Sequence, residues 1–139
     1  MTILQSLRAY FVDCPALSGE LGADFLDRSV GAFALEAVPG KEVLTRYTDG
    51  GTLKQFLFLL SSRCPYGRDA AENMENGTPY EAVADWLREQ ARTGTLPRLS
   101  GDRAAVRVTP LTGGYVLEGE AGTARYQMQL ELVYYEGGR

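Results

Sequence analysis

Three carboxylates recur at every fourth position in a stretch of the chain whose pattern is helical: Glu81, Asp85 and Glu89. Side chains four residues apart lie on one face of an α-helix, so these three could together hold a divalent ion or bind a basic partner. Arg88 and Arg92 lie within helical reach and would partly neutralise that face. The same spacing is typical of a solvated helix face, and a carboxylate-dependent site therefore stays one alternative.

The rest of the composition is poor in catalytic chemistry. The 139-residue chain contains no histidine, the side chain most often used as a general base near neutral pH and the commonest metal ligand. Mechanisms of the Ser/His/Asp and Cys/His types are therefore excluded. The 16 glycines form neither of the glycine-rich patterns that cradle phosphates. We expect a protein that is not an enzyme, with no catalytic residue, metal site or cofactor.

The two cysteines, Cys14 and Cys64, lie far apart and form neither a CxxC pair nor a ligand cluster. The pattern favours two partly buried thiols in a reducing compartment, because free cysteine behaves as a small hydrophobic residue. A disulfide between them stays open at this point.

The charge balance speaks against direct binding of nucleic acid. Fourteen basic and 18 acidic residues give a net charge of −4, and no basic stripe is present to displace counterions from phosphates. A surface past which DNA slides without adhering is compatible with this balance. The first residues lack the pattern of an export signal, and no segment approaches the roughly 20 apolar residues of a membrane span. We expect a soluble protein made in the cytoplasm, without membrane contact.

Helical signals occur in two main places. Thr2 can cap a helix whose apolar residues recur at three- and four-residue intervals, and Pro15 ends it near Cys14. A second helix begins at a predicted capping box in which Thr78 is the N-cap, and it ends at Gly94. A short helix is expected over residues 69–75, and residues 16–30 are expected to form a loop with at most one helical turn.

Six strands are expected from alternation and from the glycine-containing turns between them. The run from Phe56 to Leu60 is apolar on both faces, which predicts a strand covered by helices on both sides. In the last strand, alternate residues from Tyr126 to Tyr134 are expected to face the core, and the other face to be wet or covered by a partner. The expected strands are residues 32–38, 42–48, 52–61, 105–111, 115–120 and 124–135, with turns at 39–40, 49–51, 112–114 and 121–123.

These elements predict one α+β domain over residues 1–139, with a mostly antiparallel, possibly mixed sheet of about six strands packed against two to three helices. The Asp49-Gly50-Gly51 hairpin supplies positive φ values at the tight turn that leads into the central strand.

Four segments of the chain carry a family resemblance. They are ILQSLRAYF (residues 3–11), RYTDGGTLKQF (46–56), YE-x-x-ADW (80–86) and TARYQ (123–127). Together they resemble small prophage proteins of Gram-positive bacteria labelled minor capsid or minor tail proteins, which are similar to the tail terminators, or tail completion proteins, of long-tailed phages. The resemblance implies an α+β subunit that forms a hexameric ring at the head-tail joint, and it carries no catalytic residue.

The resemblance also implies partners and a location. They are further copies of the same chain, the tail-tube protein and the head-tail connector, in the bacterial cytoplasm during assembly and then in the tail or neck of the virion. DNA would pass through the ring without specific binding. Another neck component, a connector or stopper, is a structural alternative. A small-molecule binding module or carboxylate-dependent enzyme is the alternative from a different class.

A ring of identical subunits needs two different, mutually complementary patches. We expect them on the hairpin tip, on the outward face of the last strand and on the loop between residues 15 and 30. The candidate interface residues are Arg46, Asp49, Gly50, Lys54, Gln127, Gln129 and Tyr135.

Overall fold

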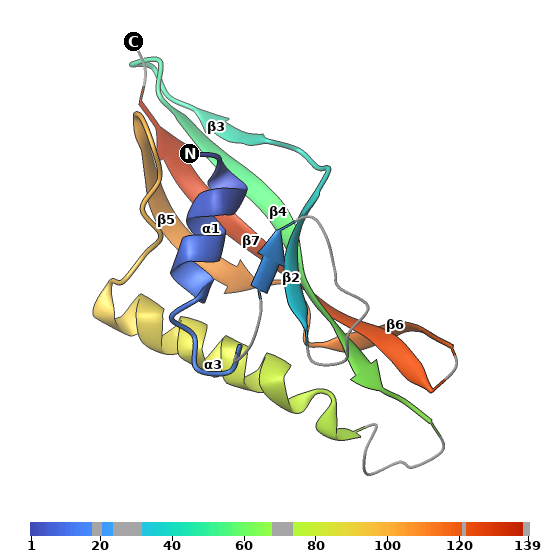
Figure 1. Ribbon diagram of the computed structural model, residues 1–139. Coiled ribbons are helices and arrows are strands. Elements are labelled where there is room, and N and C mark those ends of the chain that lie inside the picture. Colours follow the sequence, from blue (N-terminus) through green and yellow to red (C-terminus); the bar gives the residue numbers. More distant parts are fainter. Residues whose placement is uncertain (18–20, 24–31, 68–73, 121, 138–139) are drawn as a thin grey trace.

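The computed structural model describes residues 1–17, 21–23, 32–67, 74–120 and 122–137. Within these ranges, two helices pack against one seven-stranded sheet (Figure 1). In chain order the elements are α1 (Ile3–Phe11), β1 (Leu21–Ala23), β2 (Phe33–Val38), β3 (Val43–Arg46), β4 (Thr52–Pro65), α3 (Thr78–Thr93), β5 (Arg103–Pro110), β6 (Tyr115–Glu120) and β7 (Thr123–Glu136).

Two 14-residue strands, β4 and β7, form the centre of the sheet. They pair antiparallel over their whole length, from Thr52 opposite Glu136 to Pro65 opposite Thr123. Two shorter strands, β2 and β3, follow one another along the outer side of β4, and β5 and β6 do the same along β7. The sheet therefore consists of four long antiparallel strands, of which the two outer ones are interrupted, and β1 is added in parallel beside β2.

The predicted α+β class with a largely antiparallel sheet is thus confirmed. The additional strand is β1, which lies where a loop was expected over residues 16–30. Its sequence, Leu21-Gly22-Ala23, has no alternation that would predict a strand, and it forms because β2 offers a free edge for pairing at Phe33. Apart from residues 16 and 17, the rest of that predicted loop lies outside the described residues, as does most of the helix expected over residues 69–75.

Two predicted chain reversals do not occur. Residues 39–40 and 112–114 were expected to turn the chain back on itself, but the strands on either side of each segment pair with the same long neighbour in the same direction. The second segment stays close to β7, because the backbone amides of Leu111 and Thr112 both donate to the carbonyl of Gln129, at 2.7 and 3.3 Å. Each segment interrupts a strand that lies on the outer side of β4 or β7.

The predicted hairpin between β3 and β4 is confirmed. The amide of Tyr47 donates to the carbonyl of Gly51 (2.8 Å), and the amide of Gly51 donates to Asp49 Oδ1 (2.8 Å). Gly50 has a φ of 92°, whereas Gly51 does not adopt a positive φ. The second glycine is required for a different reason, since a Cβ there would lie 2.0 Å from the Tyr135 hydroxyl.

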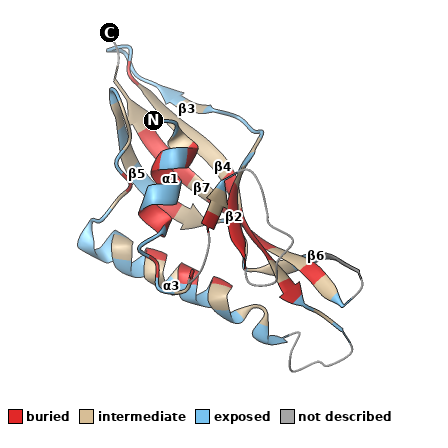
Figure 2. Ribbon diagram, in the orientation of Figure 1, coloured by how far each residue is buried: buried red, intermediate tan, exposed pale blue. Residues whose placement is uncertain are grey.

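Both helices cover the same face of the sheet, which corrects the prediction of helices on both sides. The Phe11 ring of α1 lies 6.0 Å from Phe58 of β4 and 5.7 Å from Trp86 of α3. Phe58 is buried, but its neighbours Leu57 and Leu59 point to the opposite face and are only half-buried. Figure 2 shows the buried residues of α3 on its side toward the sheet. An apolar run predicts burial, but it does not say what supplies the cover.

The predicted alternation of β7 is confirmed on the core side. Its buried residues on that side include Met128, Leu130, Leu132 and Tyr134, all at 2% exposure or less. Among the described residues, no helix combines the length and apolar character needed to cross a bilayer.

The capping box is found at the other helix. Thr2 Oγ1 accepts from the amide of Gln5 (3.1 Å), and Gln5 Oε1 accepts from the amide of Thr2 (2.7 Å). At α3 the N-cap is Gly77, Thr78 is already helical, and no side chain caps the helix. The predicted capping box at Thr78 is therefore absent and the helix begins one position earlier than predicted, although Gly94 does end the helix, with a φ of 74°.

This difference predicts unequal effects of two like substitutions. We expect Thr2→Ala to lower the free energy of unfolding by about 1 kcal/mol, because it removes a cap bond from the first turn. Thr78→Ala, the matched control, should change it by less than about 0.5 kcal/mol. Urea unfolding followed by circular dichroism measures both, and equal losses would contradict the assignment of the caps.

Candidate functional site

The predicted interface residues fall into two groups. Arg46, Asp49, Gly50, Lys54 and Tyr135 lie around the β3–β4 hairpin, where the end of β7 passes beside the start of β4. Gln127 and Gln129 lie on the same strand as Tyr135 but six or more residues before it, which corresponds to about 20 Å along a strand. The structure thus brings five of the seven together and separates the two glutamines from them. The loop between residues 15 and 30 lies mostly outside the described residues.

The hairpin tip is anchored on both faces of the sheet. Arg46, Asp49 and Gly50 are exposed. On the face away from the helices, the rings of Tyr47 and Tyr135 lie 6.0 Å apart. On the helix-covered face, Lys54 is held by an acidic pair: its Nζ lies 2.7 Å from Glu136 Oε1 and 3.9 Å from Glu42 Oε2. The hairpin tip therefore exposes Arg46 and Asp49, while the Tyr47–Tyr135 contact and the Lys54–Glu136 ion pair hold the hairpin against β7.

The Lys54–Glu136 pair predicts a dependence of stability on pH. The hydrogen bond from Lys54 lowers the pKa of Glu136 below its usual value, and the same bond raises the pKa of Lys54. A carboxyl group with a depressed pKa in the folded state stabilises the fold above its unfolded pKa, and this contribution is lost as the pH falls through the folded pKa. We expect the wild type to lose more stability than Lys54→Gln between pH 6 and pH 3, as measured by urea unfolding. Parallel losses would contradict a role for the pair.

A polar network crosses the face of the sheet away from the helices. Arg125 of β7 forms an ion pair with Glu36 of β2, and Ser61 donates to Glu36 Oε1 (3.2 Å). Beside it, Gln127 and Gln129 both donate from Nε2 to the Tyr115 hydroxyl, at 2.9 and 3.0 Å.

The two glutamines differ in how accessible they are. Gln127 is only 6% exposed, so its amide is committed within the subunit, whereas Gln129 is exposed. The alternation of β7 predicted the face of Gln127 correctly but not its burial, which depends on Tyr115 from a neighbouring strand.

An apolar groove lies next to this network. Val38, Leu57, Leu59 and Leu111 line it together with Gln129, and its volume is about 220 Å³. No described helix covers this face, and half-buried leucines remain in contact with solvent there. Such an apolar patch with a polar border is typical of a surface that contacts another protein.

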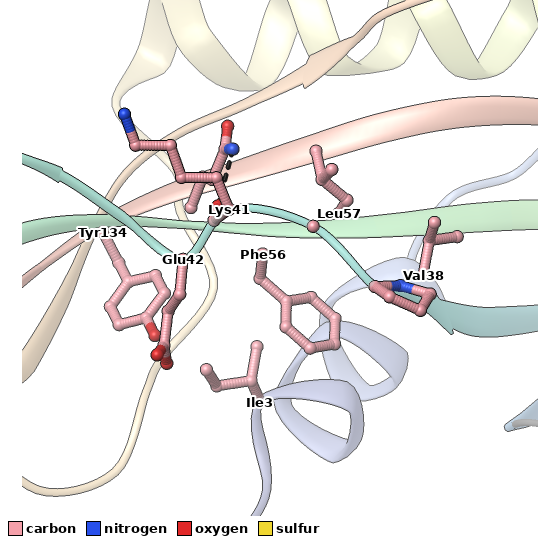
Figure 3. A pocket seen from close by; sticks show the side chains of 10 residues that line it. Ile3, Val38, Lys41, Glu42, Phe56, Leu57 and Tyr134 are labelled. Carbon is pink, nitrogen blue, oxygen red and sulfur yellow. Dashed lines mark hydrogen bonds between the residues drawn. The ribbon is translucent and has the colours of Figure 1, made fainter.

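A second hollow lies where the outer strand is interrupted between β2 and β3 (Figure 3). Its volume is about 350 Å³, and its apolar wall includes Ile3 from α1 and Phe56 from β4. Figure 3 shows Glu42 pointing toward Tyr134, and proximity to this carboxylate, after burial itself, raises the pKa of the Tyr134 hydroxyl. The connection between β2 and β3 packs closely against β4, because a Cβ at Gly40 would lie 2.5 Å from Leu57 Cδ1.

The outer edge formed by β5 and β6 carries apolar residues that sequence reasoning missed. Val106, Leu111, Val116 and Leu117 are 44%, 50%, 38% and 52% exposed. The register of pairing with β7 shifts beside Val106 and again beside Leu117. A signal was present in Val116-Leu117, since two adjacent apolar strand residues cannot both face the core.

The carboxylates Glu81, Asp85 and Glu89 of α3 are exposed, and two of them form ion pairs. Asp85 Oδ1 lies 2.6 Å from Arg88 Nη1, and Glu89 pairs with Arg92. The expected neutralisation of this helix face by arginines is thereby confirmed. Among the described residues, no group of three potential metal ligands comes together.

Both cysteines are buried and free. Cys14 follows α1 and Cys64 lies near the end of β4. Burial raises the pKa of each thiol, which disfavours the reactive thiolate. They act as packing residues in this structure.

No family model matches this chain, and no curated protein matches it significantly.

Proposed function

We propose that the chain is a non-enzymatic structural protein of a phage or prophage tail, of the tail-terminator type, whose copies form a ring at the head-tail joint. The proposal is motivated by the resemblance of residues 3–11, 46–56, 80–86 and 123–127 to such proteins. One structural observation supports it most: the sheet face opposite the helices carries half-buried leucines and an apolar groove without cover from any described helix.

That surface suits a protein partner better than a small solute. The groove has a volume of about 220 Å³, which lies below the usual range of roughly 300 to 1,000 Å³ for ligand pockets. Its margin includes the exposed amide of Gln129, and the network of Arg125 and Glu36 keeps the neighbouring charges paired. Burial of this part of the surface by another subunit would therefore leave neither of these two charges unpaired.

The net charge of −4 per subunit is compatible with a lumen through which DNA passes. Charges of the same sign repel over a Debye length of about 8 to 10 Å at physiological ionic strength. Other copies of the chain, the tail-tube protein and the head-tail connector are the partners in this proposal.

The test is co-expression of the chain with a phage tail-tube protein, followed by electron microscopy and light scattering. We expect rings of fixed size, either free or capping tubes. A chain that stays monomeric at high concentration and beside the tube protein would contradict the proposal. Rings that bind the connector but not the tube would favour a connector or stopper.

A variant of the uncovered face sharpens this test. Leu59→Gln keeps the size of a half-buried side chain but places an amide in the groove, and we expect it to reduce ring formation. Thr78→Gln, at an exposed position of α3 and therefore not on this sheet face, is the control. Thermal unfolding of both variants separates a loss of assembly from a loss of folding.

A further inference from the structure

An arginine without a partner lies on the face of the sheet away from the helices. Arg63 of β4 belongs to this face, since its neighbour Ser62 points the other way and shares a hydrogen bond with Tyr80 of α3. The Nε atom of Arg63 is buried and donates no hydrogen bond. Within the described part of the chain, its guanidinium forms no ion pair with a carboxylate. Burial of an unpaired N–H group of a cation is costly unless a further group binds there.

A second arginine lies directly beside Arg63. In the pairing of β4 with β7, Arg63 is opposite Arg125. Residues opposite one another in an antiparallel pair have Cβ atoms about 4.5 to 5.5 Å apart, and like charges in such a pair are destabilising. Arg125 forms an ion pair with Glu36 of β2. Two positive charges and one negative charge therefore leave this cluster of Arg63, Arg125 and Glu36 with a net charge of +1.

The polar groups around this cluster are engaged with Arg125 and Glu36 and do not contact Arg63. Ser61 donates to Glu36 Oε1 (3.2 Å), and Gln127 Oε1 accepts from Arg125 Nε (3.2 Å). These bonds hold the Arg125–Glu36 pair in place on the sheet. Arg63 is thus the cation of the cluster that lacks a counter-charge among the described residues.

The cluster stays within reach of a solute. Arg63 is half-buried, and the side chains of Arg125 and Glu36 are 21% and 20% exposed. A guanidinium that is partly withdrawn from water binds an anion more strongly than a fully exposed one, because the local dielectric constant is lower. The arrangement therefore favours an anionic ligand at Arg63.

We propose that the guanidinium of Arg63 binds a carboxylate group, with Arg125 as the second positive charge beside it. The planar fork of arginine matches a carboxylate with two parallel hydrogen bonds. A carboxylate has a single negative charge, which cancels the +1 of the cluster, whereas a phosphate group, at about −1.5 to −2 near pH 7, would exceed it. The net charge of −4 on the chain also disfavours a more highly charged anion. This site does not depend on the proposed function.

Acetate, compared with chloride at equal ionic strength, is the probe that tests the site. We expect acetate to shift the Nε–H resonances of Arg63 and Arg125 in NMR spectra along a saturable curve, and to raise the temperature of thermal unfolding. Arg63→Gln should weaken acetate binding, followed at Arg125, at least about tenfold, as expected for the loss of a charge-assisted hydrogen bond. Arg98→Gln, at an exposed position between α3 and β5, is the matched control and should bind acetate as the wild type does.

Equal shifts in acetate and chloride, or unchanged acetate binding by Arg63→Gln, would overturn the proposal, as would tighter binding of inorganic phosphate than of acetate. If Arg63→Gln does not fold, Arg63→Lys replaces it, since lysine keeps the charge without the planar fork and should lose the preference for acetate over chloride.

Dilution of the wild type without acetate identifies the source of the carboxylate. Where acetate binds and the Arg63 resonance also moves on dilution, an acidic side chain of another copy supplies the carboxylate. Where acetate binds and dilution has no effect, the ligand is a small free carboxylate, and both results support the site. Acetate binding is measured without ring formation, so a failure of this site leaves the proposed function standing, and the reverse also holds.

Discussion

The Phe11→Ala variant is expected to lose about 3 to 5 kcal/mol of its free energy of unfolding, the range typical of phenylalanine truncation in a core. Phe11 is fully buried and joins three elements. Its ring meets Phe58 edge-on at 6.0 Å and Trp86 at 5.7 Å, so it packs α1 against the sheet and against α3 at the same point. Removing the ring leaves a cavity that none of these backbones can collapse to fill.

Val12→Ala is the matched control, because Val12 is the next residue and its side chain is 54% exposed. We expect this control to change the free energy of unfolding by less than about 0.5 kcal/mol. Urea unfolding followed by Trp86 fluorescence and by circular dichroism measures both variants. A small effect of Phe11→Ala would mean that the two helices do not share a core on this face of the sheet.

Features with a local cause could be predicted from the sequence. The helix after Thr2, the stop at Gly94 and the Asp49-Gly50-Gly51 hairpin each depend on residues within a few positions of one another. The core side of β7 was also predictable, because its alternation persists over a long strand. In such segments the periodicity and the turn residues agree.

Features that depend on distant residues could not be predicted. Nothing near Leu57 and Leu59 indicates that both helices cover the opposite face of the sheet. The strand β1 exists only because β2 has a free edge, and β6 follows β5 along one neighbour because β7 is long enough to pair with both. Such pairings join segments that are distant in the sequence, so they depend on the whole fold and not on local sequence patterns.

In the candidate interface, too, local groupings could be predicted from the sequence, whereas features that depend on distant residues could not. The residues near the hairpin could be grouped from the sequence because the turn itself brings them together. Gln127 was placed on the correct face, yet it is buried under contacts from another strand. The exposure of Val106 arises from a shift of register with β7, and no property of its own segment predicts that shift.

The Gly114→Ala variant is expected to lose about 2 to 3 kcal/mol of its free energy of unfolding, at the upper end of the usual cost of overpacking. A Cβ on Gly114 would lie 2.7 Å from Tyr80 Cγ, 2.8 Å from Tyr80 Cβ and 2.8 Å from Tyr126 Cε1. Tyr80 cannot move aside easily, because it is 1% exposed and its hydroxyl donates to the carbonyl of Tyr126 (3.0 Å) and shares a second hydrogen bond with Ser62. The clash is with the base of a side chain fixed on α3.

Gly113→Ala is the matched control, because a Cβ there would meet no atom within 4 Å and its φ is not positive. The same substitution one residue earlier should therefore be nearly neutral or slightly stabilising, since it restricts the unfolded chain. If residues 112–114 formed the tight reversal that their composition suggests, both glycines would be expected to resist replacement. A loss at Gly114 alone supports an interrupted edge strand pressed against the Tyr80–Tyr126 pair, and equal losses would contradict it.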